Sequence, residues 1–438
     1  LSGIGEDEAD CRQRGRLRDG HRLSCQAKLL GDVLIDVPAG SQVHRQVVRK
    51  DFEDHDIELD PVIHLYFVEV DEPDMERQEG DLQRLQKALE REWGLKDLRC
   101  DLRVLQELQP VLRDGKRSVT VAVRHDKEII AVWPGFRDRA CGAAVDIGST
   151  TIAVHLCDLT SGEVIGSAGA MNPQIRFGED LMSRVSYAML HPEGAGQMTR
   201  AVRKAVSGLI VETAEQADID PADVLELTLV GNPVMHHLLL GIDPSPLGTA
   251  PFALATDHAL DIRAVEYDLA VHPNAQAYVL PCIAGHVGAD TAAVLLAETP
   301  WDRDEVSLII DVGTNAEIVL GNRDRLLASS SPTGPAFEGA QISGGQRAAP
   351  GAIERVRIDL ESLEPRFKVI GSESWSDEPG FLDEVGECDV TGICGSGIIE
   401  AIAGMYLAGL VQPDGTIDGA AAVSYTHLTL PTKEDGWG

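Results

Sequence analysis

The sequence lacks any long apolar run. Its 438 residues contain no uninterrupted apolar stretch of about 18 residues, the length that crosses a bilayer. No signal peptide opens the chain, which starts at Leu1 rather than at a methionine. We therefore expect no membrane span and a cytoplasmic location, and we expect the native N-terminus to lie upstream of Leu1.

Positive charge is also scarce. The chain has 38 basic and 71 acidic residues, which leaves a net charge of −33. A nucleic-acid backbone or an anionic lipid surface would be repelled by such a chain, so we expect neither as a partner. The acidic balance itself indicates little more than solubility.

Paired cysteines are missing as well. The eight cysteines are scattered, and no two form a Cys-x-x-Cys pair. In a chain this long, that spacing indicates reduced thiols rather than a disulfide framework.

What the sequence does contain is a pair of similar glycine turns. One reads Asp146-Ile-Gly-Ser-Thr-Thr and the other, 165 residues later, reads Asp311-Val-Gly-Thr-Asn. Each follows a short apolar run and precedes an apolar returning run, at 152–156 and at 316–320. The pattern predicts a buried strand, a tight turn and a second strand, twice. Two such units indicate a duplicated α/β nucleotide-binding domain with a cleft between its halves.

The residue types in the two turns suit a metal-bound phosphate. Glycine lets backbone N–H groups approach an anion, hydroxyl groups add donors, and an aspartate can hold a hydrated Mg²⁺. We assign Asp146 and Asp311 to the Mg²⁺ waters and to catalysis. The residues expected to bind the phosphates are Gly148, Ser149, Thr150, Gly313, Thr314 and Asn315.

Further candidates carry an alternative interpretation. Asp290 either positions the attacking water or the Mg²⁺ shell, or caps a helix. Glu317 either hydrogen-bonds the waters of the metal or is a solvated strand residue. The turn at 392–397 places Gly395 and Gly397 near a nucleoside, or only packs. His236 and His237 are metal or corrinoid ligands, or ordinary buried histidines.

Hydrophobic spacing predicts the remaining elements. We expect a strand over 63–70, helices over 81–93 and 102–112, and a hairpin of strands over 118–124 and 128–133. Leu82, Leu85 and Leu89 share one face of the first helix, and Gly94 ends it. Further on, we expect helices over 198–216, 221–227 and 291–297 and strands over 227–230 and 277–280.

Together these stretches resemble a known family, the reductive activators of corrinoid-dependent methyltransferases. These are ferredoxin-linked ATPases of the acetate kinase, sugar kinase, Hsp70 and actin superfamily. Besides the two turns, the resemblance rests on Asn172-Pro-Gln-Ile-Arg-Phe-Gly-Glu-Asp with Ser183-Arg, Val230-Gly-Asn-Pro-Val-Met-His-His, Leu280-Pro-Cys-Ile-Ala-Gly-His-Val-Gly-Ala-Asp, Gly334-Pro-Ala-Phe-Glu-Gly and Arg347-Ala-Ala-Pro-Gly-Ala-Ile. It covers about 1–422.

The resemblance implies a domain order. Residues 1–40 would be the end of a β-grasp [2Fe–2S] ferredoxin domain, 41–60 a linker, 61–140 a middle α+β domain and 141–422 an incomplete actin/Hsp70-like ATPase domain. We interpret 423–438 as a non-native, adaptor-derived tail. Cys25 matches the last cluster cysteine, and the other three ligands would lie upstream of Leu1. The chain as given is therefore predicted not to hold the cluster, which needs four ligands, whereas the intact protein would.

The implied function is ATP-dependent reduction of a corrinoid protein from Co(II) to Co(I), with one electron from the iron–sulfur cluster. ATP and Mg²⁺ are the expected cofactors. The expected partners are the corrinoid protein, a reductase that donates electrons, and a second copy of the chain. Two alternatives remain: an activator ATPase of the 2-hydroxyacyl-CoA dehydratase type, which needs a cluster held by cysteines of the ATPase domain, and a non-redox actin- or Hsp70-like nucleotide-binding protein.

Overall fold

The structure is a computed structural model. It describes residues 59–76, 78–313, 315–333, 344–385 and 390–417, together with residues 4, 9, 12, 30 and 342. The chain divides into two compact units, Leu1–Arg45 and Gln46–Gly438, and almost all described residues belong to the second. No helix in the described part is long and apolar enough to cross a membrane. Cys25, the expected cluster ligand, lies outside the described residues.

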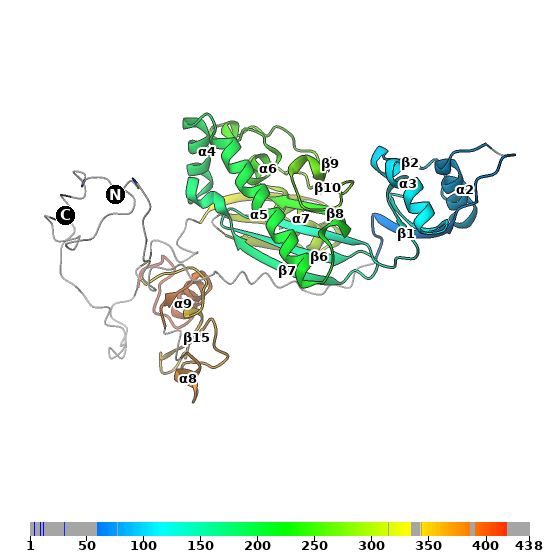
Figure 1. Cartoon of the computed structure of the whole chain (residues 1–438). Helices are drawn as coiled ribbons and strands as arrows, with labels where there is room; N and C mark the ends of the chain where they lie inside the picture. The colour runs from blue at the N-terminus through cyan, green and yellow to red at the C-terminus, as the bar shows by residue number, and fades with distance from the viewer. Residues whose placement is uncertain are drawn as a thin grey trace. The chain divides into compact units, whose positions relative to one another are not determined.

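A small α+β unit comes first (Figure 1). Its sheet has the strand order β1-β3-β4-β2, in which β2 runs parallel to β4 and the other neighbours are antiparallel. Its elements are β1 (Ile63–Glu69), α2 (Asp81–Trp93), β2 (Arg99–Cys100), α3 (Leu102–Asp114), β3 (Ser118–Arg124) and β4 (Glu128–Pro134). The predicted strand, both helices and the hairpin are confirmed to within two residues.

Helix α2 shows why these predictions succeeded. Leu85 and Leu89 lie on its buried face and pack against α3 and the sheet. The helix ends at Gly94, which has a left-handed φ of 74°; the Gly94 N–H donates to the Glu90 carbonyl and the Leu95 N–H to the Leu89 carbonyl. Both signals are local, so the sequence displays them directly.

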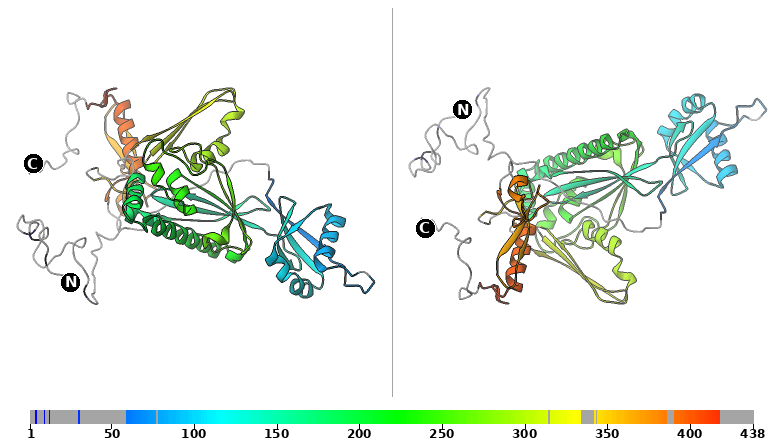
Figure 2. Two further views of the ribbon diagram at one scale, coloured as in Figure 1. Left: turned by 90° about the horizontal axis from the view of Figure 1, so that it is seen from above. Right: turned by 90° about the horizontal axis from the view of Figure 1, so that it is seen from below.

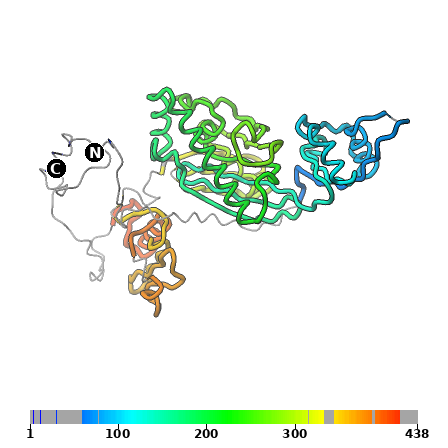
Figure 3. The backbone as a smooth tube through the Cα atoms, viewed as in Figure 1, coloured from blue at the N-terminus to red at the C-terminus, as the bar shows by residue number. Residues whose placement is uncertain are grey.

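The other face of this small sheet packs against the next part of the chain. Ala122 and Ile130 share a buried cluster with Leu225. Arg124, only 5% exposed, donates to Glu226 (Nε–Oε2, 2.9 Å) and to Asp261 (Nη2–Oδ1, 2.8 Å). A buried guanidinium shared by two carboxylates fixes the two sheets against each other. Figure 3 follows the backbone across this junction, from β4 into β5.

A six-stranded sheet forms the first half of the predicted nucleotide-binding domain, with the order β7-β6-β5-β8-β10-β9. β5, β6 and β7 form an antiparallel meander, and β8 lies parallel to both β5 and β10. The strands are β5 (Cys141–Ile147), β6 (Thr151–Asp158), β7 (Val164–Met171), β8 (Val224–Gly231), β9 (Leu260–Arg263) and β10 (Gln276–Val279).

Helices cover this sheet. The long helix α5 lies along β6 and β7 and buries Met198, Val202, Val206 and Ile210, and Figure 2 shows its course from above and below. The helices of this half are η2 (Pro173–Phe177), α4 (Leu181–Leu190), α5 (Gly194–Gln216), η3 (Pro221–Asp223), α6 (Pro233–Leu240), η4 (Ser245–Gly248), η5 (Ala264–Tyr267) and α7 (Ala289–Glu298).

The helix predicted over 221–227 is wrong. Only a 3-10 turn forms there, over Pro221–Asp223, and the chain then enters β8 at Val224. β8 is an inner strand between β5 and β10, and six of its eight residues are buried. Hydrogen bonding and burial on both sides outweigh the local helical preference of this leucine-rich segment.

The second half contains two smaller sheets, β11-β12-β13 and β15-β14-β16. The first is an antiparallel meander, like the start of the first half. The described elements of this second half are η6 (Pro300–Asp302), β11 (Ser307–Val312), β12 (Asn315–Gly321), β13 (Leu326–Pro332), β14 (Ala352–Ile358), β15 (Pro365–Val369), α8 (Phe381–Val385), β16 (Gly392–Ile393) and α9 (Gly395–Leu407).

Candidate functional site

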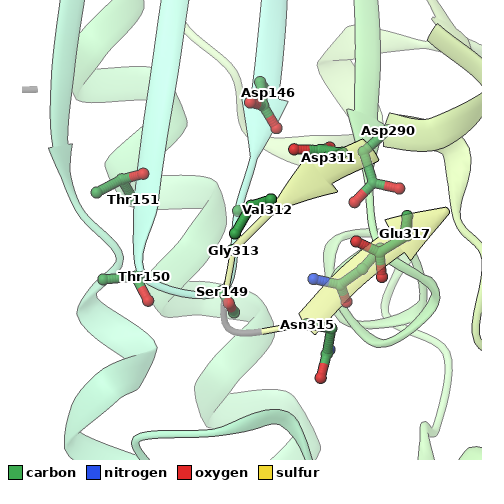
Figure 4. Close-up of a pocket in the computed structure, with 12 residues that line it drawn as sticks. Asp146, Ser149, Thr150, Thr151, Asp290, Asp311, Val312, Gly313, Asn315 and Glu317 are labelled. Atoms are coloured by element: carbon green, nitrogen blue, oxygen red, sulfur yellow. The ribbon is translucent and has the colours of Figure 1, made fainter. Parts of the chain in front are cut away.

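The two glycine turns meet at one pocket (Figure 4). Its volume is about 260 Å³. The residues that line it come from β5, the start of β6, β11, β12, the two turns, the start of α7 and the residue before α6. They are Asp146, Gly148, Ser149, Thr150, Thr151, Asn232, Asp290, Asp311, Val312, Gly313, Asn315 and Glu317.

The first turn joins β5 to β6. The Gly148 N–H donates to the Thr151 carbonyl at 2.9 Å and closes the turn. A Cβ atom at Gly148 would lie 2.6 Å from that same carbonyl oxygen, so the turn requires glycine here. Ser149 and Thr150 follow at the tip and face the pocket. The predicted strand, tight turn and returning strand are confirmed here.

Two buried polar residues hold this turn from behind. The Asn172 side chain, 1% exposed, donates to the Gly148 carbonyl at 2.8 Å. Arg184 is completely buried and donates through Nη2 to the Ser149 carbonyl at 2.6 Å and through Nε to the Gly178 carbonyl at 2.9 Å. A guanidinium directly below the turn also adds positive charge where a phosphate would bind.

The second turn joins β11 to β12 and is closed in a similar way, but it is one residue shorter. The Gly313 N–H donates to the Asn315 carbonyl at 2.8 Å, and the Thr333 hydroxyl donates to the Gly313 carbonyl. A Cβ atom at Gly313 would lie 3.4 Å from the Asn315 oxygen, which is an ordinary contact. Thr314, the residue between them, lies outside the described residues.

Four carboxylates gather around the pocket, and no described lining residue is Lys, Arg or His. Burial raises the pKa of Asp290, and the nearby Asp311 raises it further. The pKa of Glu317 is raised to about 7, first by burial and then by the charge of Asp290, although a hydrogen bond from the Ser330 hydroxyl at 3.1 Å lowers it. Ionised carboxylates this close together repel one another, and a bound cation would offset that repulsion.

The donor set fits a hydrated divalent cation carried by a nucleotide. No three His, Cys, Asp or Glu side chains in the described part are arranged to enclose a metal ion by themselves. Mg²⁺ commonly keeps several waters and takes only one or two carboxylates plus phosphate oxygens. Asp146 and Asp311 would hold such waters, and the cation would offset the repulsion between phosphate and carboxylate. When bound, Mg²⁺ supplies charge stabilisation at the phosphate.

The structure decides between the alternative positions that the sequence left open for Asp290 and Glu317. Asp290 is not the N-cap of α7, because Gly288 holds that place. Its carboxylate accepts the Thr291 N–H at 2.8 Å and lies at the pocket wall. Glu317 is half-buried and also lines the pocket, which differs from a solvated strand residue.

Other predicted site residues lie elsewhere. Gly395 and Gly397 begin α9 and do not line the pocket, and a Cβ atom at Gly397 would lie 2.4 Å from the Ile353 carbonyl, so this turn packs tightly. His236 and His237 lie in α6 and are 3% and 1% exposed. His237 Nδ1 lies 2.8 Å from the Pro233 carbonyl while Nε2 accepts the Ala255 N–H at 3.0 Å, a structural arrangement.

Sequence reasoning assigned no role to Asn172, Arg184, Asn232 or Thr151. Asn172 and Asn232 each precede a proline and cap the following helix, because their side chains accept the N–H of Gln174 and of Met235. That Asn-Pro pattern was visible in the sequence. Arg184 gave no such signal, since an arginine in an amphipathic segment is usually exposed.

The described cysteines offer no site for a cluster. Cys141, Cys282 and Cys394 are buried, and burial raises the pKa of the Cys141 and Cys282 thiols to about 12. Since no cluster of His, Cys, Asp or Glu that could hold a metal is present among the described residues, nothing in this part of the chain favours the 2-hydroxyacyl-CoA dehydratase type of activator.

Three family models match the chain in succession. They are described as the RACo linker region, over 53–139, the RACo middle region, over 141–299, and the C-terminal domain of RACo, the ASKHA domain, over 305–432. The ASKHA description confirms the predicted actin- and Hsp70-like α/β fold. The predicted end of a ferredoxin domain lies outside the described residues.

Two named relatives are similar over much of the chain. Corrinoid activation enzyme RamQ of Eubacterium limosum is 35% identical over 274 residues, which are 63% of this chain and 43% of that protein. A Co(II) methylated-amine-specific corrinoid protein reductase of Methanosarcina barkeri is 30% identical over 293 residues, 62% of this chain and 52% of that protein. The chain thus spans about half the length of each.

A solved structure is similar as well. The reductive activator for a corrinoid, iron–sulfur protein superposes with a TM-score of 0.71 at 32% identity, and the match covers 87% of this chain and 61% of that one. The fold and three consecutive matched regions agree, and this chain belongs to the RACo family.

Proposed function

We propose that the full-length protein uses ATP to drive the reduction of a corrinoid protein from Co(II) to Co(I). The observation that carries this proposal is the convergence of two glycine turns and four carboxylates on one pocket, in a chain of this family. The names of its relatives, a corrinoid activation enzyme and a Co(II) corrinoid protein reductase, support the same reaction.

Different residues of the pocket contact the phosphates, the waters of the metal and the attacking water. The N–H groups and hydroxyls of Ser149 and Thr150 face the phosphates from the first half, and Gly313 and Asn315 face them from the second. Asp146 and Asp311 hold the waters of Mg²⁺, and Asp290 positions the attacking water. Because the ligands come from both halves, bound nucleotide favours a closed pocket over an open one.

That closure couples to the cobalt. In the reaction the partner's Co(II) accepts one electron, supplied by an iron–sulfur centre of the intact protein, and becomes Co(I). For a one-electron couple, about 59 mV or about 1.4 kcal/mol corresponds to a tenfold change in the equilibrium constant. A nucleotide-bound state that binds the partner more tightly with Co(I) than with Co(II) shifts the equilibrium by its difference in affinity. A separate reductase would return the electron to the centre.

The assignment of Asp146 and Asp311 is open to a direct test. In the full-length protein, Asp146→Ala and Asp311→Ala should each abolish ATP-dependent Co(I) formation while the visible spectrum of the iron–sulfur centre stays unchanged. Asp324→Ala, in an exposed turn between β12 and β13, is the matched control and should keep wild-type rates. Undiminished ATP-dependent reduction by either pocket variant would refute the assignment.

A further inference from the structure

A basic groove lies on the outer side of α5. We define it by four cationic residues: Arg176 at the end of η2, and Arg200, Arg203 and Lys204 on α5. It consists of two neighbouring hollows of about 440 and 380 Å³, which share Arg200 and Lys204. One carboxylate, Asp268, also lines it. In a chain with 71 acidic and 38 basic residues, this local excess of positive charge is unusual.

The positive charges of the groove are not neutralised by carboxylates of the described residues. None of the four lies within 4.0 Å of a carboxylate oxygen of any described residue. Arg203 is held in place by donating to the Leu239 carbonyl at 2.8 Å and by lying 4.3 Å over the Tyr267 ring. Arg176 lies 4.6 Å over the Phe177 ring. Arg176 and Arg203 are thus pre-organised for an anionic partner, and Arg200 and Lys204 add positive charge between them.

The size of the groove indicates a polypeptide rather than a small anion. From Arg200 to Val211 it follows α5 for about 17 Å at the helical rise per residue. Beyond the cations, its floor is made by Gly208, above which a side chain would meet nothing within 4 Å, and by Val211. An open floor next to a charged end suits a segment that carries acidic and small apolar side chains.

We propose that this basic groove is the docking surface for an acidic segment of the corrinoid protein, the partner required by the proposed function, on which this inference rests. Net charge favours a protein partner with a local acidic patch over nucleic acid or an anionic membrane, because the chain as a whole repels extended anions. The groove then supplies steering and orientation.

A short series of contacts also links the groove to the first glycine turn. Arg176 and Phe177 end η2, and η2 begins after Asn172, whose side chain holds the Gly148 carbonyl of the first turn. Within η2, the buried Gln174 donates to the Met198 carbonyl of α5 at 3.0 Å. Docking at the groove and nucleotide at the turn therefore act on one short rigid segment, so each should alter the affinity for the other.

The test uses the full-length protein and the Co(II) form of a methylated-amine-specific corrinoid protein, the type named with the Methanosarcina barkeri relative. The double variant Arg200→Glu/Lys204→Glu should bind it about tenfold more weakly or worse and lose most of the salt dependence of association. Arg99→Glu/Lys127→Glu makes the same change in net charge at exposed sites of the small α+β unit, and should bind like the wild type. ATP hydrolysis without partner should be unchanged in both.

A second readout does not depend on substitutions. In the wild-type complex the Lys204 amine should become protected from acetylation, whereas Lys127 should react as in the free protein. Equal affinities of the two double variants, or an unprotected Lys204, would overturn the docking surface. Inorganic tripolyphosphate that occupies the groove without competing with the corrinoid protein would mark a small-anion site and overturn it too.

The outcomes separate this inference from the proposed function. If the wild type binds and reduces the corrinoid protein while Arg200→Glu/Lys204→Glu does both equally well, only the groove is wrong. If the wild type forms no Co(I) with Mg-ATP, the proposed function fails, and the groove fails with it as a corrinoid docking surface.

Discussion

The two glycine turns of the pocket are closed in a similar way but differ in what supports them. In both, a glycine N–H closes the turn on the returning strand, at 2.9 Å for Gly148 and 2.8 Å for Gly313. Behind the first turn lie the buried side chains of Asn172 and Arg184, whereas the second is held through the Thr333 hydroxyl. The same motif can therefore be built on a rigid or on a lightly held base.

The strands that lead into the turns differ in the same direction. Five of the seven residues of β5 are buried, while none of the six residues of β11 is, so the predicted buried strand is confirmed for β5 and wrong for β11. On β11, Leu308, Ile310 and Val312 are 60%, 51% and 52% exposed. Among the described residues, the first turn thus belongs to a packed core and the second to an open sheet. This difference predicts that equivalent changes in the two turns have unequal effects.

The largest effect should come from the base of the first turn. Arg184→Ala removes a fully buried guanidinium and leaves the Ser149 and Gly178 carbonyls without these donors, so we expect a loss of about 3–5 kcal/mol in unfolding free energy. The counterpart Thr333→Ala removes a hydroxyl near the surface that donates to the Gly313 carbonyl, and it should cost about 1 kcal/mol or less. Denaturant unfolding of both variants measures the contrast, and equal losses would contradict it.

The second-largest effect should be a loss of folding stability in the first half at acidic pH. Burial lowers the pKa of His236 to about 4, and the neighbouring His237 adds to the shift. The folded state then binds fewer protons than the unfolded state between about pH 6.5 and pH 4. Stability is complete above that window and falls as the pH drops through it, by about 3 kcal/mol for this residue.

His236→Phe should make the loss of stability between pH 7 and pH 4 smaller. The control His258→Phe changes a residue whose side chain is 90% exposed and should leave the pH dependence as it is in the wild type. Thermal unfolding at several pH values gives the comparison. Parallel pH curves for His236→Phe and the wild type would show that His236 is not the group responsible.

The glycines themselves give a matched pair of smaller effect. Gly148→Ala would place a Cβ atom 2.6 Å from the Thr151 carbonyl oxygen, so the turn must open and Mg-ATP should bind at least about tenfold more weakly. Gly313→Ala places its Cβ atom at 3.4 Å from the Asn315 oxygen and should change binding by less than about threefold. Titration calorimetry tests both, and a larger effect of Gly313→Ala would reverse the proposed order.

The last effect concerns pH and the second half. Burial and the charges of Asp290 and Asp311 raise the pKa of Glu317 to about 7. The folded state therefore holds a proton below pH 7 that the unfolded chain releases nearer pH 4.5, so this residue lowers stability as the pH rises through that window, opposite to His236. Since a metal-bound nucleotide prefers the ionised carboxylate, Mg-ATP affinity should rise about tenfold from pH 6 to pH 8.

Two variants sharpen this prediction. Glu317→Gln should flatten the pH dependence of Mg-ATP binding. Ser330→Ala removes the hydrogen bond that lowers the pKa of Glu317 and should move the curve to higher pH. A curve that stays in place in both variants would assign the titration to another group.

Local signals made much of this fold predictable from the sequence. Several features depend on only a few consecutive residues. They are the leucine spacing and Gly94 of α2, the hairpin of β3 and β4, and both glycine turns. The carboxylates Asp146, Asp290, Asp311 and Glu317 were also named as candidates, because each stands beside a turn or the start of a helix.

What could not be predicted depends on distant residues. β8 follows a 3-10 turn where a helix was expected over 221–227, because its place between β5 and β10 decides its conformation. Arg184 supports a turn 35 residues earlier in the chain, and Glu226 pairs with Arg124 across 102 residues. Such contacts are set by packing, and no spacing in the sequence announces them.

The central claim is that nucleotide in this pocket drives the reduction of cobalt, and one spectrum tests it. The full-length protein, with its iron–sulfur centre reduced, is mixed with a Co(II) corrinoid protein, and Co(I) is followed by its visible absorbance with and without Mg-ATP. Our account predicts that Co(I) accumulates with Mg-ATP and not without it. Co(I) that forms to the same extent without nucleotide would contradict the account, because the pocket would then play no part in the reduction.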